Sequence, residues 1–203
     1  MNETRRQVLQ AARRQFARHG YDAASVRNIT RAARANLGAV TYYFESKQKL
    51  YLEVLQQATQ PLRERIEHAA ATQGSPLQRI EQIIRAFFDH LAEHPDMPAL
   101  ILRELALERP IPLPVRAVMG SVFVALRGCL EEGQRDGSIV SGDVRHLAIG
   151  IVSQPIYTAL AQRPLREVLG LGLQDSTVRA QMVDDVVRFV RRALSSPAKG
   201  EER

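Results

Sequence analysis

Residues 25–47 read SVRNITRAARANLGAVTYYFESK and hold two short apolar periods separated by a tight turn. In both periods the apolar residues recur every three or four positions, which is the spacing of one helical face. Ser25 precedes the first period and Asn36 the second, and both residue types are preferred N-caps. The stretch therefore predicts two short helices joined by the turn Arg34-Ala35-Asn36. Their inward-facing residues are Val26, Ile29, Ala33, Val40 and Phe44.

Longer helices are predicted on either side of this stretch. The preceding helix is expected to end at Gly20 in a left-handed cap. The following helix begins after Ser46 and contains Pro61, which should kink it. A short helix, a tight turn and a second short helix make the helix-turn-helix pattern, in which the second helix presents its N-terminal residues to the major groove of DNA. The apolar face of the preceding helix consists of Val8, Leu9, Ala12 and Phe16.

Positive charge is concentrated in the same part of the chain. Residues 1–60 contain ten Lys and Arg against four Asp and Glu, a net charge of +6, while residues 61–203 contain eighteen of each. The net charge of +6 for the whole chain therefore lies in its first 60 residues. Such an asymmetry favours a nucleic-acid or anionic-membrane partner for the basic part. A solvated basic surface is the alternative interpretation of charge alone.

The composition excludes several classes of protein. With 45% apolar and 25% charged residues in 203, the chain is globular and not disordered. No run of about 18 uncharged apolar residues occurs, which excludes a membrane-spanning helix. Of the two kinds of partner that the charge favours, nucleic acid is expected and a membrane is not. The single cysteine, Cys129, indicates the reducing cytoplasm. No nucleophile motif, Gly-rich phosphate loop or metal-ligand cluster appears, so neither an enzyme nor a cofactor or metal site is expected.

The remainder of the chain predicts a bundle of longer helices. The first begins at Pro76 after a Ser75 cap, and the second runs from about Ala99 to Glu108. An extended segment over residues 110–114 precedes the third, which ends at about Arg135. The fourth runs from Asp143 to about Gln162, and the fifth from Asp175 or Ser176 to about Ser195. The fold class is all-α, with about nine helices. A DNA-binding domain over 1–47 and an effector-binding and dimerisation domain over 48–203 are expected to share the fourth helix.

Roles in DNA contact follow from position. Arg27 on the exposed helix face can bond a guanine, a phosphate, or only solvent. Thr41 and Tyr42 point outward because Val40 and Phe44 fill the inner face. Lys47, in the first turn of the next helix, can hold a phosphate together with backbone amides. The candidate DNA-binding residues are Arg27, Asn36, Leu37, Gly38, Ala39, Thr41, Tyr42, Tyr43 and Lys47.

The runs Ser25–Ile29 and Asn36–Lys47, with Ala32-Ala33 between them, resemble the tetracycline-repressor (TetR/AcrR) family of transcriptional regulators. The resemblance covers about residues 5–55, and its Tyr-Tyr-Phe-x-Ser-Lys end is specific. It implies the same contact roles for Arg27, Thr41, Tyr42 and Lys47. It also implies a homodimeric repressor that a small, largely apolar effector releases from a palindromic operator. Arg34 stands where the family usually has glycine.

The second half supplies candidates for an effector pocket and a dimer surface. Large apolar residues favour either a pocket or a plain core at Phe87, Phe88, Met97, Leu100, Met119, Phe123 and Tyr157. Arg103, in an apolar helix, is expected either to orient an effector or to pair at the surface. Wide apolar stripes on the last two predicted helices favour a dimer surface or burial within one chain. Their candidate interface residues are Ile149, Val152, Ile156, Leu160, Val183, Val187, Val190 and Leu194.

Two functions therefore compete on sequence alone. The first is a ligand-released transcriptional repressor in the bacterial cytoplasm, associated with the nucleoid when bound to DNA. The alternative is an architectural protein that binds DNA without sequence preference or ligand control. The two differ in their affinity for a specific site relative to random DNA.

Overall fold

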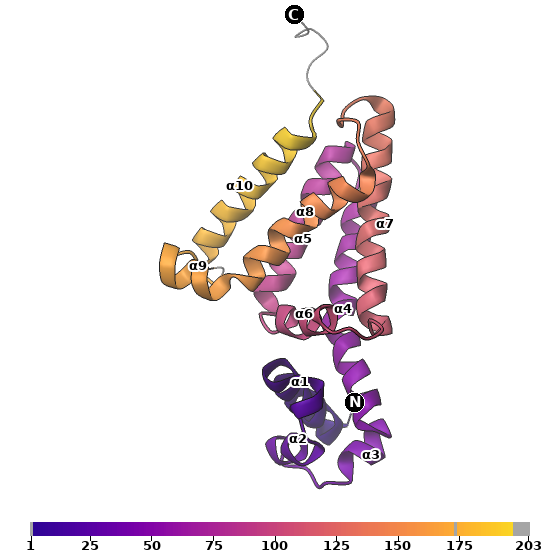
Figure 1. Cartoon of the computed structure of the whole chain (residues 1–203), viewed down its shortest axis with the longest axis vertical. Helices are drawn as coiled ribbons and strands as arrows, with labels where there is room; N and C mark the ends of the chain where they lie inside the picture. Colours follow the sequence, from indigo (N-terminus) through magenta and orange to yellow (C-terminus); the bar gives the residue numbers. More distant parts are fainter. Residues whose placement is uncertain (1, 173, 197–203) are drawn as a thin grey trace, which may run out of the picture. The chain divides into compact units, whose positions relative to one another are not determined.

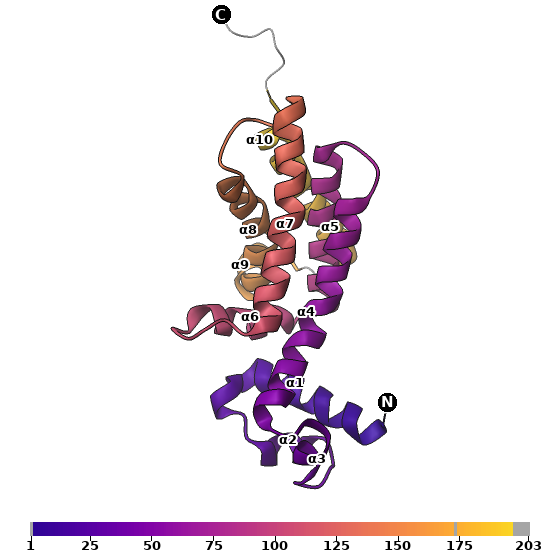
Figure 2. The same cartoon turned by 90° about the vertical axis from the view of Figure 1, so that its right-hand side faces the viewer.

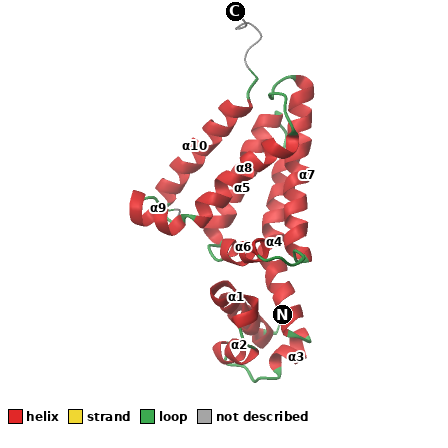
Figure 3. Ribbon diagram, viewed as in Figure 1, coloured by secondary structure: helices red, strands yellow, loops and turns green. Residues whose placement is uncertain are grey.

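The computed structural model describes residues 2–172 and 174–196, and these residues form helices joined by short loops (Figure 3). Within them, the one β contact is an isolated antiparallel bridge between Ile139 and Ser195. The all-α prediction is confirmed, with ten helices in the described residues where about nine were expected. The helices are α1 Glu3–Ala23, α2 Val26–Ala32, α3 Ala39–Phe44, α4 Lys47–Ala71, α5 Pro76–Glu93, α6 Met97–Ala106, α7 Leu113–Asp136, α8 Val144–Leu160, α9 Gln162–Leu169 and α10 Ser176–Leu194.

The chain forms two compact units, and each unit is assembled from separate parts of the sequence. The first combines residues up to 60 with 96–118, and the second combines 61–95 with the residues from 119 onward. In the first unit, α1, α2 and α3 gather around the first turns of α4 (Figure 1). α4 and α7 each contribute to both units. The domain boundary expected between residues 47 and 48 lies in the first turn of α4 and stays a prediction.

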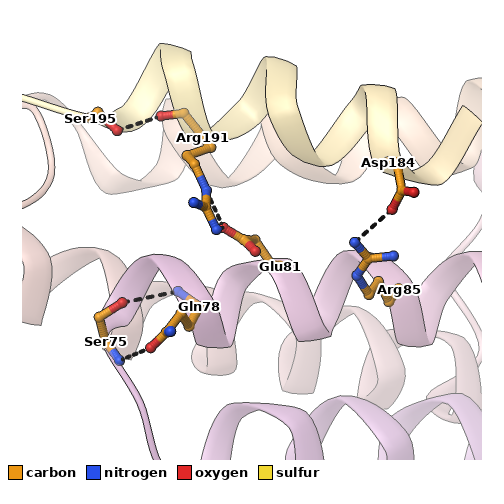
Figure 4. Close-up of polar contacts among 7 residues, drawn as sticks. All are labelled: Ser75, Gln78, Glu81, Arg85, Asp184, Arg191 and Ser195. Carbon is orange, nitrogen blue, oxygen red and sulfur yellow. Dashed lines mark hydrogen bonds and ion pairs between the residues drawn. The ribbon is translucent and has the colours of Figure 1, made fainter. Parts of the chain in front are cut away.

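Side-chain caps at predicted residues begin five of the helices, α2, α4, α5, α8 and α10. The Ser25 hydroxyl accepts a hydrogen bond from the backbone N–H of Asn28 at 3.1 Å. Ser75 and Gln78 form a reciprocal capping box at the start of α5 (Figure 4). The expected cap of the recognition helix is wrong: Asn36 accepts from Ala39 through its backbone carbonyl, at 3.1 Å, and Gly38 is the N-cap. α3 therefore begins at Ala39, after a longer turn.

Two backbone positions explain how the first unit turns. Gly20 has a φ of 79° and a ψ of 175°, so it interrupts α1, which resumes for the residues that follow. The positive φ was expected there, but the left-handed helical cap was not formed. Arg34 has a φ of 53°, a conformation that costs a residue with a Cβ about 1 kcal/mol or more. The turn of the helix-turn-helix thus carries the strain expected of a non-glycine residue.

In the second unit, α5, α7 and the later part of α4 lie side by side (Figures 1 and 2). Polar contacts join all three pairs of helices. Arg65 on α4 pairs with Glu93 on α5 at 2.6 Å, and Arg79 on α5 pairs with Glu132 on α7 at 2.5 Å. The Ser121 hydroxyl on α7 donates to a carboxylate on α4, that of Glu67, at 2.6 Å. The bundle predicted for this half of the chain is therefore present.

α10 packs on α5 through an apolar strip, and two ion pairs also join the two helices (Figure 4). Arg85 pairs with Asp184 at 2.7 Å, and Arg191 donates to Glu81 at 2.6 Å. The strip consists of Val183, Val187, Val190 and Leu194, each 3–5% exposed. These four residues belong to the core of a single chain, which argues against their assignment to a dimer surface. A wide stripe on a helix does not distinguish its own core from a partner's.

The connection into α7 is shorter than expected. Residues 110–112 are not helical, but the helix begins at Leu113, so Pro114 occupies its second position, where proline is tolerated. By length and composition alone α7 would suffice to cross a membrane, with a mean hydropathy of 1.5 over its best window. Core helices pass the same test, and Val115, Leu126 and Leu130 of α7 are buried within the protein.

Candidate nucleic-acid interface

The recognition helix α3 has one buried and one exposed face. Val40 and Phe44 are 2% and 4% exposed and anchor the helix in the first unit. Thr41 and Tyr42 are exposed, and Tyr42 presents 81% of its surface to solvent. Tyr43 is half-buried and makes an edge contact with the Tyr42 ring, with 4.7 Å between centroids. Because a largely exposed aromatic side chain contributes little to a core, Tyr42 is available for contact with a partner.

The turn before α3 forms the tip of the motif. Asn36, Leu37 and Gly38 are exposed, and Leu37 presents 61% of its surface to solvent. Ala39 is only 5% exposed, and its contact with a base stays a prediction. It is the first residue of α3 and lies beside Val40 on the buried face. The exposed part of the tip is therefore one residue shorter than the sequence indicated.

α2 supplies one further candidate contact. Arg27 is exposed, while Ile29 on the opposite face is fully buried. The Thr30 hydroxyl is also buried and donates to the backbone carbonyl of Val26 at 3.1 Å, within the helix itself. Within the described residues Arg27 makes no ion pair. Its guanidinium therefore remains available for a base edge or a phosphate.

Lys47 lies at the start of α4, where Ser46 caps the helix by accepting from the backbone N–H of Lys49 at 3.1 Å. Its ammonium sits 4.4 Å from the centroid of the Tyr21 ring and donates to the backbone carbonyl of Asp22 at 3.4 Å. The ring and the carbonyl come from the end of α1. The ring face attracts the cation, so Lys47 is positioned at the helix N-terminus before any phosphate binds.

A buried polar cluster, which sequence reasoning missed, lies behind Tyr21. Glu104 on α6 is 1% exposed, and its Oε1 accepts from the Tyr51 hydroxyl at 2.6 Å and from Arg109 at 2.7 Å. The Tyr21 and Tyr51 rings are 5.0 Å apart. Burial, and then the hydrogen bond to the Glu104 carboxylate, raise the pKa of Tyr51 well above its usual range. Tyr51 therefore stays protonated and donates to Glu104.

Side chains of α6 and of the residue before it also bond directly to α1. Arg13 forms a two-pronged ion pair with Asp96, at 2.5 and 2.7 Å. Arg103 donates to the backbone carbonyl of Arg18 at 3.0 Å, beside the interruption at Gly20. A Cβ at Gly20 would lie 2.6 Å from the Arg103 guanidinium. Arg103 thus satisfies a helix-end carbonyl, and its role in orienting an effector stays a prediction.

The remaining pocket candidates occupy different environments. Phe87 and Phe88 of α5 are buried in the second unit, and Met97 and Leu100 of α6 are buried in the first. Phe123 is half-buried. Met119 and Tyr157 are 46% and 67% exposed, so in a single chain they lie on the surface and do not line an enclosed cavity. No group of three or more metal-ligating side chains occurs among the described residues.

Two family models match the chain along most of its length. "Bacterial regulatory proteins, tetR family" matches residues 8–54, and "Tetracyclin repressor-like, C-terminal domain" matches residues 76–190. The chain belongs to the tetR family. The family assignment makes it a DNA-binding transcriptional regulator, and the helix-turn-helix of α2 and α3 is its DNA-binding motif.

Relatives agree with this assignment. The HTH-type transcriptional repressor NicS of Pseudomonas putida is 23% identical over 95% of this chain and 93% of its own length. The ketosteroid transcriptional regulator KstR2 of Mycobacterium tuberculosis has the same fold, with a TM-score of 0.78, 20% identity and 97% of each chain covered. FadR from Bacillus subtilis, solved in complex with stearoyl-CoA, gives 0.74 at 19% identity over 93% of this chain and 98% of its own.

Proposed function

We propose that this regulator is a homodimeric repressor that binds a palindromic operator and leaves it when a small molecule binds. The observation that carries the proposal is the outward display of Arg27, Thr41 and Tyr42 from a helix-turn-helix whose opposite face is anchored by buried residues. Two such heads related by a two-fold axis read two half-sites about one or more helical turns apart. The chain acts in the cytoplasm, at the nucleoid when DNA-bound, and catalyses no reaction.

The ratio of two affinities tests this function. An operator is first selected from a pool of random duplexes, and its affinity is compared with that of mixed-sequence DNA at the same salt concentration. A sequence-specific regulator prefers its operator by about 10³ or more. A ratio near one would favour the alternative function, an architectural protein that binds any duplex.

Arg27→Ala tests whether Arg27 reads a base. Loss of a bidentate contact to guanine should cost about 1–3 kcal/mol on the operator and relax the preference at one base pair in each half-site. Competition binding against operators substituted at single positions measures both effects. An equal loss of affinity on every duplex would make Arg27 a phosphate contact.

Lys47→Ala tests the phosphate contact at the start of α4. The slope of log affinity against log salt concentration should fall by about one for each head on the duplex, on operator and random DNA alike. Lys49→Ala is the matched control, because the Lys49 ammonium is exposed, two residues away and paired with Glu45. A slope that stays unchanged in Lys47→Ala would exclude Lys47 from the interface.

The proposed dimer surface consists of the exposed faces of α8 and α10. On α8, Ile149 is 64% exposed, and Ile156 and Leu160 are 37% and 44% exposed, with Val152 half-buried between them along the helix. On α10, Phe189 is 62% exposed. Patches of this kind mark association sites on soluble proteins. Phe189 therefore takes the place of the four buried α10 residues in the proposed interface.

The proposed effector has a substantial apolar part. FadR binds stearoyl-CoA, and KstR2 is described as a ketosteroid regulator, so both relatives point to ligands with large apolar groups. The experiment combines thermal-shift measurements on long-chain acyl-CoA and steroid probes with release of the selected operator. A compound that raises Tm and lowers operator affinity supports ligand control. If compounds raise Tm but none of them changes the affinity for the operator, ligand control is contradicted.

A further inference from the structure

The turn of the helix-turn-helix holds an arginine where the backbone favours glycine. α2 ends in a Schellman motif, in which the Ala35 N–H donates to the Thr30 carbonyl at 2.9 Å and the Arg34 N–H donates to the Arg31 carbonyl at 3.1 Å. This motif requires a left-handed residue at position 34, and Arg34 has a φ of 53°. Glycine adopts that conformation without steric cost, whereas any Cβ is crowded there. The arginine side chain therefore comes at a cost in stability.

Arg34 belongs to a group of exposed arginines whose charges are not neutralised within the chain. Arg27 and Arg31 are one turn apart on the exposed face of α2, and Arg34 follows one turn later and is also exposed. None of the three makes an ion pair within the described residues. Arg5 and Arg13 of the first unit are paired, with Glu53 and Asp96, at 2.7 and 2.5 Å. Arg14 and Arg18 of α1 are exposed and also make no ion pair within the described residues. The three arginines of α2 and its turn therefore add to the positive potential of the first unit.

The position of Arg34 brings this charge close to the recognition tip. Leu37 lies three positions after Arg34, and a fully extended segment of that length spans about 10 Å. The major groove is about 12 Å wide, and phosphates line both of its edges. With Leu37 at the mouth of the groove, an exposed guanidinium three residues away lies within reach of those phosphates.

We propose that Arg31 and Arg34 bind the DNA backbone beside the groove that α3 enters, as two phosphate contacts in addition to Lys47. The inference rests on the proposed mode of DNA binding and deepens it. Strained backbone positions persist where a side chain is needed for function, and Arg34 fits that rule. Guanidinium groups suit the task because their planar array of donors matches phosphate oxygens.

Arg34→Gly tests the inference, because it should move stability and affinity in opposite directions. Relief of the left-handed strain should raise Tm by about 2–4 °C. Loss of the guanidinium should weaken binding to a mixed-sequence duplex about tenfold at low salt and reduce the log–log salt slope by about one for each head. Sequence preference should be retained, since phosphates carry no sequence information. Thermal unfolding and fluorescence anisotropy measure the two effects.

Three further variants separate charge from backbone flexibility. Asparagine tolerates the left-handed conformation and carries no charge, so Arg34→Asn should reduce the log–log salt slope by the same amount as Arg34→Gly. Arg31→Gln should reduce the salt slope by a similar amount. Its Tm should not rise, because residue 31 is helical and has no left-handed strain to relieve. Arg192→Gln is the control, since Arg192 is exposed on α10 and makes no ion pair within the described residues. Its slope should equal that of the wild type.

The outcomes distinguish this inference from the proposed function. If the wild type binds DNA and the slope of Arg34→Gly or Arg34→Asn is unchanged, Arg34 is not a phosphate contact and the inference is overturned alone. A fall in Tm for Arg34→Gly overturns the argument from strain. If the wild type binds no duplex under any salt condition, the proposed function fails and the inference fails with it.

Discussion

Val187→Asp is expected to unfold the chain and not merely to separate a dimer. Val187 is 5% exposed and lies between Asp184 and Arg191, the two α10 residues that pair with α5. An aspartate there places a charge inside the contact between α10 and α5, and its short side chain cannot carry the charge to solvent. A buried unpaired charge costs about 3–5 kcal/mol, which is a large part of the 5–15 kcal/mol that holds a typical domain folded.

Circular dichroism on heating and urea unfolding measure this effect. The helical signal should be lost at a much lower temperature than in the wild type, or be absent after expression at 37 °C. Val124→Asp is the matched control, because it makes the same substitution at a valine of α7 that is 59% exposed. If Val187→Asp keeps the wild-type Tm and becomes monomeric, α10 does not pack on α5 as described.

Local signals in the sequence were sufficient for the helix-turn-helix. Ser25, Val26 and Ile29 lie within a few residues of one another, as do Val40 and Phe44, so the cap and the apolar spacing predict two short helices from neighbouring residues alone. The start of α3 escaped prediction because Asn36 and Gly38 both suit the N-cap position. This error also affected the candidate site, because Ala39 was expected at the exposed tip but lies on the buried face.

Contacts between residues distant in the sequence were beyond such reasoning. Glu104 and Tyr51 are 53 positions apart, and no periodicity relates them, so the buried cluster that supports Tyr21 was not foreseen. A hint did exist, because Glu104 follows Leu100 at helical spacing and therefore shares the buried face of α6. A carboxylate on an apolar face implies a buried partner, although the sequence does not say which one.

The prediction that the apolar stripe of α10 forms a dimer surface had a related weakness. Val183, Val187, Val190 and Leu194 predict an apolar contact correctly, but hydrophobic spacing carries no information about which chain supplies the other surface. The structure assigns these residues to α5 of the same chain and leaves Phe189 outside. A dimer surface is therefore best sought among the apolar residues that one chain leaves exposed.

Ile149→Glu is expected to split the dimer while each chain stays folded. Ile149 is 64% exposed in the single chain, so a glutamate there costs little in the monomer. In a two-fold interface the same residue enters from both chains, and each substitution acts twice. Two unpaired charges in a dry interface, at about 3 kcal/mol each, weaken association by about four orders of magnitude. Light scattering and sedimentation should then show a monomer with the wild-type helical signal.

Operator binding should fall together with dimerisation, because one head buries only about 600–1,000 Å² of its surface on DNA. The variant should bind the operator and random DNA with similar, weak affinity, since a single head reads a half-site. Val124→Glu is the matched control: it adds the same charge at an exposed apolar residue of α7 and should remain a dimer with wild-type operator affinity. A dimeric Ile149→Glu that still binds the operator tightly would show that α8 is not at the interface. If the wild type is a monomer and still binds the operator tightly, two heads held together in a dimer are not needed for tight binding, and the proposed homodimer is wrong.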